Sequence, residues 1–242
     1  LVNWYSKLTV AVQWNECLSH SFCVKSGVRQ GSPLSPALFN VFVNMYIVKT
    51  KESGQGCFMN GAWLGCIMYA DDIILLSASC RGLQNLLTCC FNVSSDLRLK
   101  FNCDKSCCIA FGPRAKLNHP QLMLGNGCLQ WCDSIKYLGI TCLSGVKFKC
   151  DIDVITRKFY AASNNIFSNA RGSPELMQLH LQEAYCLPIL QYASAAVCFT
   201  QTQLNTMKIC WNNVYRKIFG FNLWNSVKQF NCGLGNLDFI SL

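Results

Sequence analysis

Two adjacent carboxylates, Asp71 and Asp72, are the residues with the clearest capacity for chemistry. They follow Tyr69-Ala70 and lie between two apolar runs, residues 66–68 and 73–76, which predict a hairpin with the carboxylates at its tip. Like charges repel, and burial beside apolar strands would raise that cost. A divalent cation would remove the conflict, and hard oxygen ligands suit magnesium, with manganese as the other choice. A plain Asp-Asp turn between strands remains the alternative, because Asp favours turns.

A second segment with ligand-binding chemistry is Gly27-Val28-Arg29-Gln30-Gly31-Ser32-Pro33-Leu34-Ser35-Pro36. Its two glycines permit a close approach of the backbone to a ligand. Arg29 adds a fixed charge, and Gln30 adds an amide able to read a base or sugar edge. We expect a helix to begin here, with Ser35 as its cap and Pro36 in its first turn, and such a terminus offers N–H groups to phosphates. A rigid cap and turn without any ligand is the alternative.

Hydrophobic periodicity predicts the elements that position these segments. Residues 4–12 suggest the end of a helix, and a helix after Pro36 and another over 83–97 each show one apolar face. Strands are predicted on either side of Gly125-Asn126-Gly127 and as one stretch over 135–141.

After Gly145 the pattern becomes helical, with apolar residues at helical spacing in 148–166 and 204–218. The sequence therefore predicts an α+β part followed by an all-helical part, with the boundary near residue 146.

The composition favours a globular chain with a polyanionic partner. Of 242 residues, 51% are hydrophobic and 14% charged, and the formal net charge is +9, which allows a substantial core. Between Glu183 and Asp238 there is no acidic residue, while four basic residues fall there. Nucleic acid is the natural partner of such a chain, and an ordinary solvated basic face is the alternative.

Eighteen cysteines are unusual for a chain of this size. A disulfide scaffold is not favoured, because the chain has enough apolar residues for a core. The cysteine spacings are also too loose for a zinc finger, so reduced thiols in an intracellular compartment fit best. The six tryptophans are expected in the core rather than as base-stacking platforms.

No membrane span is expected, because the longest apolar stretch, residues 184–199, is short and contains Pro188. The chain shows no signal peptide, and it begins with Leu1 rather than Met. We therefore expect a fragment of a longer protein.

Taken together, the segments resemble the reverse transcriptases of non-LTR (LINE-type) retrotransposons. Gly27 to Phe39 resembles the motif B of that family, and Tyr69 to Asp72 resembles its motif C. Asn102-Cys103-Asp104-Lys105-Ser106 resembles motif D, and Tyr137-Leu138-Gly139 resembles motif E, the primer grip. The resemblance covers nearly the whole chain in order. It implies an RNA-directed DNA polymerase that transfers nucleotides by a two-metal mechanism, in a parent element of the nucleus and cytoplasm.

The resemblance also implies a fold and a role for each motif. Residues 1–146 would be a partial polymerase palm, an antiparallel sheet with packed helices, and residues 147–242 a helical thumb. Asp71 would be the principal magnesium ligand and Asp72 the second one, while Lys105 would stabilise or protonate the departing pyrophosphate. The RNA template, the DNA primer and the deoxynucleoside triphosphate would contact the following residues: Arg29, Gln30, Gly31, Ser32, Pro33, Tyr69, Tyr137, Leu138 and Gly139.

One part of the family pattern has no counterpart here. Motif A lies upstream of motif B and holds another metal-binding Asp, yet the only acidic residue before Gly27 is Glu16, in a segment unlike motif A. We therefore expect the fingers and motif A in a missing N-terminal part of the parent polyprotein, and we expect this chain alone not to polymerise.

Three other interpretations remain open. The chain could be a non-catalytic nucleic-acid-binding remnant of a retroelement, including a domesticated piece. It could be a structural or interaction protein that kept only the fold. It could also belong to a group II intron or telomerase-type polymerase, although Tyr185-Cys186-Leu187-Pro188 favours the retrotransposon branch.

Overall fold

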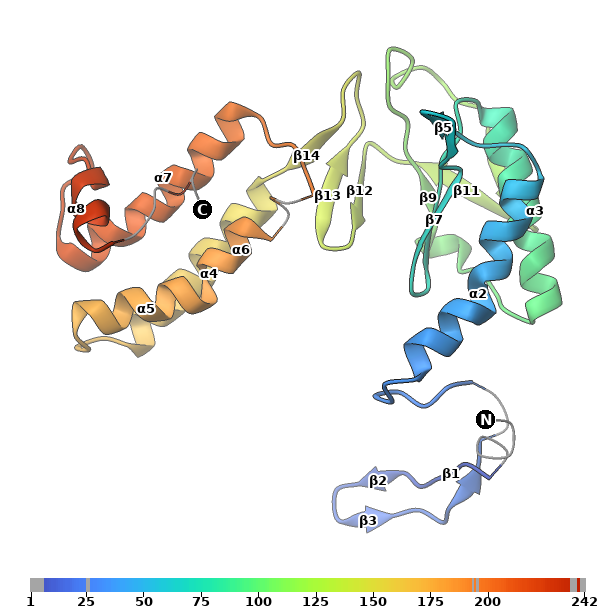
Figure 1. Ribbon diagram of the computed structural model, residues 1–242, viewed down its shortest axis with the longest axis horizontal. Helices are drawn as coiled ribbons and strands as arrows, with labels where there is room; N and C mark the ends of the chain where they lie inside the picture. The colour runs from blue at the N-terminus through green and yellow to red at the C-terminus, as the bar shows by residue number, and fades with distance from the viewer. Residues whose placement is uncertain (1–6, 25–26, 193, 195, 236–238, 240–242) are drawn as a thin grey trace. The chain divides into compact units, whose positions relative to one another are not determined.

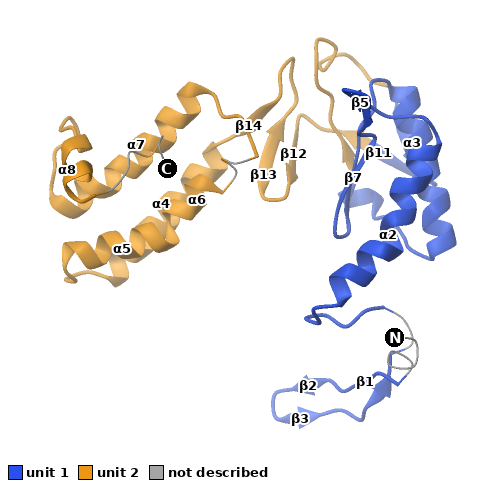
Figure 2. Cartoon of the chain, viewed as in Figure 1, with its two compact units in different colours: residues 1–106, 120–129 blue, residues 107–119, 130–242 orange. Residues whose placement is uncertain are grey.

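The computed structural model describes residues 7–24, 27–192, 194, 196–235 and 239. Within them the chain is a mixture of helices and small, mostly antiparallel sheets (Figure 1). It divides into two units, residues 1–106 with 120–129 (unit 1) and residues 107–119 with 130–242 (unit 2), which Figure 2 shows in different colours. Each unit is described by itself.

Unit 1 contains the hairpin and loop singled out in the sequence. Its elements in chain order are β1 (Thr9–Val10), β2 (Gln13–Trp14), β3 (Cys17–Leu18), β4 (Phe22–Cys23), α2 (Ser35–Glu52), β5 (Phe58–Met59), β6 (Ala62–Trp63), β7 (Cys66–Tyr69), β8 (Asp72–Leu75), α3 (Cys80–Leu97), a 3₁₀ turn (Cys103–Lys105), β10 (Leu122–Leu124) and the first part of β11 (Gly127–Trp131).

Helices α2 and α3 pack on each other and on the β7–β8 hairpin. Helix α3 begins where the hydroxyl of Ser79 accepts the Gly82 N–H at 3.1 Å, a side-chain cap of the expected type. The core of unit 1 is a cluster of buried side chains from both helices: Val43, Tyr46, Cys90 and Val93.

Half-buried hairpin residues complete this core. Met68 of β7, together with Ile73 and Leu75 of β8, packs against the cluster, and these three apolar contacts fix the hairpin to the two helices. Inside the cluster the hydroxyls of Tyr46 and Ser94 share a buried 2.8 Å hydrogen bond. Burial raises the pKa of Tyr46, and that hydrogen bond opposes the rise.

Unit 2 is a helical bundle preceded by a small sheet. Its elements are β9 (Cys107–Cys108), the end of β11, β12 (Ser134–Tyr137), β13 (Ile140–Leu143), β14 (Lys149–Asp151), α4 (Asp153–Asn169), α5 (Glu175–Tyr185), α6 (Leu187–Gln191), α7 (Gln201–Phe219) and α8 (Lys228–Gly233). β12, β13 and β14 form an antiparallel sheet in that order.

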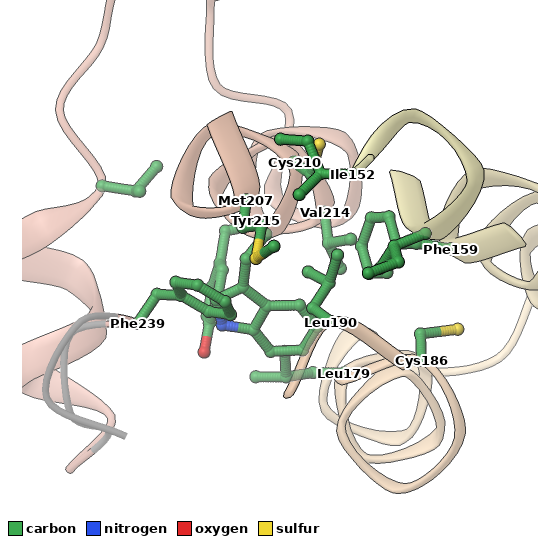
Figure 3. Packing of buried hydrophobic residues seen from close by; sticks show 13 residues of the cluster. Ile152, Phe159, Leu179, Cys186, Leu190, Met207, Cys210, Val214, Tyr215 and Phe239 are labelled. Carbon is green, nitrogen blue, oxygen red and sulfur yellow. The ribbon is translucent and has the colours of Figure 1, made fainter. Parts of the chain in front are cut away.

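The core of unit 2 lies among helices α4 to α7. Phe159, Leu190 and Val214 point toward one another from three of these helices (Figure 3). Trp211 is 1% exposed and makes edge-to-face ring contacts with Phe159 and Tyr215. Helix α7 begins with a capping box, in which Thr200 and Gln203 each bond the backbone of the other.

Several predictions about elements are confirmed. The hairpin around Asp71, the helix over 83–97, the turn at Gly125-Asn126 and the helix over 204–218 all occur at the expected places. The second half is not all helical, because β14 at Lys149–Asp151 pairs with β13 before α4 begins.

Other predictions are wrong. The described part of 4–12 is not helical, because Thr9 and Val10 pair with β4. The single strand over 135–141 is two strands that turn back at Leu138-Gly139.

The tryptophans divide between core and surface. Trp211 is in the core and Trp63 is half-buried, but Trp14 and Trp224 are exposed, so the expectation of core positions is wrong for the last two. Trp4 lies outside the described residues.

Candidate active site

The carboxylates Asp71 and Asp72 lie at the tip of a tight hairpin. β7 and β8 pair in register from Cys66↔Leu75 to Tyr69↔Asp72, which leaves Ala70 and Asp71 as a two-residue loop. Both carboxylates are exposed, and so is Tyr69. The expected burial of the two carboxylates is therefore wrong, and their mutual repulsion is weak because water screens both charges. Two carboxylates therefore face solvent at the tip of a hairpin whose strands are held by apolar contacts with α2 and α3.

The backbone at this tip is strained. Ala70 has φ +51°, in the left-handed region that glycine or asparagine normally occupies. Two-residue hairpins require positive φ at this first loop position, so the chain adopts the tight turn without the residue that favours it. Such strain at an exposed polar tip marks a candidate functional position.

The donor set fits magnesium in part. Carboxylate oxygens are the ligands this ion prefers, and it is commonly held by one or two of them together with substrate phosphates. Among the residues that the structure describes, neither carboxylate makes a side-chain hydrogen bond or an ion pair, so both are available as ligands. Within the same residues no group of three or more His, Cys, Asp or Glu side chains gathers. Asp71 and Asp72 therefore form two ligands of a site that needs further ones.

The loop of Arg29 to Pro33 is held by hydrogen bonds to one carbonyl. The Arg29 carbonyl accepts from the backbone N–H of Ser32 at 3.3 Å and from the hydroxyl of Ser35. Ser35 is buried and bonds backward into the loop, so the prediction that it caps the helix is wrong. The N-cap position is Leu34, which makes no side-chain cap.

With its backbone held by these hydrogen bonds, the loop has most of its polar side chains in solvent. Arg29, Gln30, Gly31 and Pro33 are exposed and Ser32 is half-buried. Gly31 has φ +80° and no atom near the place of a Cβ, so its backbone is open to a ligand. No hydrogen bond or ion pair among the described residues joins this loop to the carboxylate hairpin.

Lys105 is positioned by the 3₁₀ turn. The side-chain oxygen of Asn102 accepts the Lys105 N–H at 3.2 Å, and the Ser106 hydroxyl donates to the Asn102 carbonyl at 2.8 Å. Phe101, just before this turn, lies edge-on to Tyr46 of the unit 1 core at 5.8 Å. The Lys105 side chain is exposed. The loop, the carboxylates and this lysine therefore all belong to unit 1.

The segment Tyr137-Leu138-Gly139 belongs to unit 2. It forms the tip of the β12–β13 hairpin, with Leu138 and Gly139 at φ +44° and +84°. The Tyr192 hydroxyl donates to the Leu138 carbonyl at 3.0 Å, which ties this tip to the end of α6. Tyr137 is half-buried, and the two tip residues are exposed.

Two features of the hairpin tips were not predicted from the sequence. The Tyr192 bond to Leu138 joins residues far apart in the chain and has no sequence signal. The left-handed Ala70 could have been inferred from the two-residue spacing of the paired runs, since such loops require positive φ.

Comparisons with known proteins agree with the motifs. Residues 1–142 match the family model described as reverse transcriptase (RNA-dependent DNA polymerase). The chain is 32% identical over 143 residues to the Pol polyprotein of the type-2 retrotransposable element R2DM of Drosophila melanogaster. That match covers 55% of this chain and 13% of the relative.

Two further relatives belong to R2 elements. The Pol polyprotein of a type-1 retrotransposable element R2 of Nasonia vitripennis is 40% identical over 62 residues, covering 26% of this chain and 6% of the relative. The corresponding protein of Popillia japonica is 32% identical over 71 residues, covering 28% of this chain and 12% of the relative. The chain thus spans a small share of these relatives. The family match covers more than half of the chain and includes both carboxylates, and the chain belongs to the reverse transcriptase family, of the non-LTR retrotransposon type.

Proposed function

We propose that this chain is part of an RNA-directed DNA polymerase of a non-LTR retrotransposon, and that the β7–β8 hairpin is its metal-binding turn. The observation that supports this most is the exposed pair Asp71 and Asp72 on a strained two-residue tip, within the segment that matches the family. In this proposal residues 1–146 are a partial palm and residues 147–242 a thumb. The substrates are deoxynucleoside triphosphates on an RNA template with a DNA primer.

Each segment has a proposed role that follows from its chemistry. Magnesium, when bound, would stabilise the charge that develops on the attacking and leaving oxygens. Asp71 would be the principal ligand and Asp72 the second. The exposed ammonium of Lys105 would stabilise the negative charge on the leaving pyrophosphate, or protonate it.

The remaining site residues would position the substrates. Arg29 and Gln30 would contact the incoming nucleotide and the template, where the open backbone at Gly31 permits close approach. Ser32 and Pro33 would hold this loop in shape. Tyr69 would pack near the primer end, and the tip of residues 137–139 would hold the primer backbone.

We further propose that this chain alone does not polymerise. Two carboxylates leave the coordination of two metal ions incomplete, and among the described residues no third acidic side chain joins them. The rest of a longer parent polyprotein would be the partner that supplies the missing ligand. This observation also favours a second candidate function, nucleic-acid binding without catalysis.

The proposal is tested by two measurements on the 242-residue chain. A labelled RNA–DNA primer–template should bind with an affinity that falls steeply with salt, because phosphate contacts release counterions. The same mixture with magnesium and nucleotides should give no primer extension. Template-dependent synthesis that Asp71→Asn abolishes, and that Asp96→Asn on the exposed face of α3 leaves intact, would contradict the proposed inactivity. Absence of salt-dependent binding would favour a structural protein that kept only the fold.

A further inference from the structure

Unit 2 contains a pair of contacting thiols that the proposed polymerase site does not use. Cys142 of β13 and Cys150 of β14 occupy directly opposite positions on two antiparallel strands. Their thiols are free and hydrogen-bond each other. Cys150 is 4% exposed, and Cys142 is half-buried. Two such thiols can be joined by a disulfide only if their backbones are also close enough.

The backbone hydrogen bonds of β13 show which kind of strand pair these cysteines form. The Ser144 N–H donates to the Asp133 carbonyl at 2.7 Å, on the side of β12. Hydrogen-bonded positions recur at every second residue of an antiparallel pair, so Cys142 bonds to β12 as well, opposite Ile135. Its N–H and C=O therefore point away from β14. Cys142 and Cys150 form a pair without backbone hydrogen bonds between them.

The other strand agrees with this assignment. The side-chain amide of Gln203 in α7 donates to the Cys150 carbonyl at 2.7 Å, as expected for a carbonyl that faces away from β13. In an antiparallel pair of this kind the two Cα atoms lie about 4.5 Å apart. A disulfide requires Cα atoms about 4.4–6.8 Å apart. The register of β13 and β14 therefore places Cys142 and Cys150 within the range of a disulfide.

A second pair of contacting thiols lacks this register. Cys107 of β9 and Cys132 also hydrogen-bond each other, but the strand partner of Cys107 is Gln130, two positions before Cys132. Strands lie about 4.8 Å apart and advance about 3.3 Å per residue, which places the Cα atoms of these two cysteines roughly 8 Å apart. That separation exceeds the limit of about 7 Å for a disulfide. Strand register therefore distinguishes the pair on β13 and β14.

The two thiols of this pair differ in reactivity. Burial raises the pKa of Cys150 to about 11. Burial also raises the pKa of Cys142, but the hydrogen bond that Cys150 donates opposes the rise. The thiolate is the nucleophile in disulfide exchange. Cys142 is therefore the thiol that attacks first, since it is the more exposed of the two and its thiolate accepts a hydrogen bond.

We propose that Cys142 and Cys150 are an oxidation site, which a small-molecule disulfide such as glutathione disulfide converts into a cross-strand disulfide. The Cys142 thiolate attacks one sulfur of glutathione disulfide, forms a mixed disulfide and displaces one glutathione thiolate. Cys150 then gives its proton to solvent, and its sulfur attacks the Cys142 sulfur and displaces the second glutathione. The two protein thiols lose two protons and two electrons, and the glutathione disulfide gains them as two glutathione thiols.

The new bond would act on the sheet that contains the tip of residues 137–139. β13 is paired with β12 on one side and with β14 on the other, and β14 is followed directly by α4. The Gln203 bond also connects Cys150 to α7. The disulfide would therefore restrain this sheet relative to the start of the helical bundle. It requires neither metal nor nucleic acid, so this proposal and the proposed function can fail independently.

The test maps disulfides in the folded chain. The chain is incubated with glutathione disulfide, the remaining thiols are blocked, and trypsin then separates Cys142 in peptide 137–147 from Cys150 in peptide 150–157. Each of these peptides contains one cysteine. Mass spectrometry should find the two peptides joined, and dithiothreitol should separate them. Absence of the joined peptides after oxidation would overturn the proposal.

Single variants test the order of attack. In Cys150→Ala the Cys142 sulfur should remain as a mixed disulfide with glutathione, because no second thiol can displace it. In Cys142→Ala the buried Cys150 should remain an unmodified thiol. Cys186→Ala, which removes another buried thiol of unit 2, is the matched control and should keep the joined peptides at the level of the unsubstituted chain. Glutathione on Cys150 in the first-named position's absence, with Cys142 unmodified in Cys150→Ala, would overturn the assigned order.

Oxidation of the urea-unfolded chain tests whether the fold selects this pair. In the folded chain the joined peptides 137–147 and 150–157 should be the dominant product, and peptides 106–114 and 117–136, which contain Cys107 and Cys132, should not be joined to each other. In urea this preference should weaken, because the other cysteines then compete for the same thiols. An equal preference with and without urea would mean that closeness in the sequence selects the pair, and it would overturn the argument from strand register.

Discussion

Substitution of Ala70 tests whether the carboxylate tip is held in a strained conformation. An L-residue in the left-handed region costs about 1–2 kcal/mol, which glycine avoids. Glycine in turn loses about 0.4–1 kcal/mol through the greater freedom of the unfolded chain. Ala70 has φ +51° and is exposed, so the change removes no packing. Ala70→Gly should therefore raise the free energy of unfolding by about 0.5–1 kcal/mol.

The same chemical change elsewhere in unit 1 provides the control. Ala37 is exposed in the first turn of helix α2, where glycine costs about 0.5 kcal/mol relative to alanine, the lower end of the range for helices. Urea unfolding followed by circular dichroism should separate Ala70→Gly from Ala37→Gly by about 1–1.5 kcal/mol, with opposite signs. If Ala70→Gly destabilises the chain as much as Ala37→Gly does, the tip is not strained and the inference from its backbone is wrong.

Three further predictions concern the cores, the thiols and the second hairpin. Trp211→Ala should lower the free energy of unfolding by about 3–5 kcal/mol because Trp211 is 1% exposed. Trp224→Ala should change it by less than about 0.5 kcal/mol because Trp224 is 85% exposed. Similar losses from both variants in urea unfolding would contradict the assigned core. Burial, with the neighbouring Cys142 adding to it, raises the pKa of Cys150 from 9.0 to about 11. The stability due to this neutral thiol is present below pH 9 and is lost as pH rises toward 11, because the thiol ionises first in the unfolded chain. Cys150→Ala should therefore reduce the fall of the unfolding free energy between pH 9 and 11. An unchanged fall would contradict this prediction. Tyr192→Phe removes the hydrogen bond to the Leu138 carbonyl and should lower the free energy of unfolding by about 0.5–1.5 kcal/mol. Amide hydrogen exchange in β12 and β13 should become faster. Unchanged exchange there would show that the bond does not hold the hairpin.

Sequence patterns predicted the elements whose structure depends on interactions between residues close together in the chain. The hairpin around Asp71 and Asp72 could be predicted because two short apolar runs lie within a few positions of each other, with Asp, which favours turns, between them. Ser35 was misassigned because a serine before proline looks like a cap, yet its hydroxyl bonds the Arg29 carbonyl six residues earlier. The turn at Leu138 was missed because residues that favour strands lie on both sides of it, Ile135 and Tyr137 before it and Ile140 and Thr141 after it, which resembles one continuous strand.

Contacts between distant residues could not be predicted from the sequence. The Lys217 bond to Asn164 and the Tyr192 bond to Leu138 each join elements more than fifty positions apart. The exposure of Trp224 also depends on how the chain leaves α7, since its own residue type favours burial.

Metal binding at the β7–β8 tip decides whether Asp71 and Asp72 are the ligands of a divalent cation. Manganese, a paramagnetic substitute for magnesium, is titrated into the chain while the backbone amide signals are followed by NMR. If both carboxylates bind the ion, the signals of residues 69–73 should broaden selectively and recover with excess magnesium. The broadening should be lost in Asp71→Asn but not in Asp96→Asn. Broadening that is absent at the tip, or that persists in Asp71→Asn, would contradict the assignment of Asp71 and Asp72 as metal ligands.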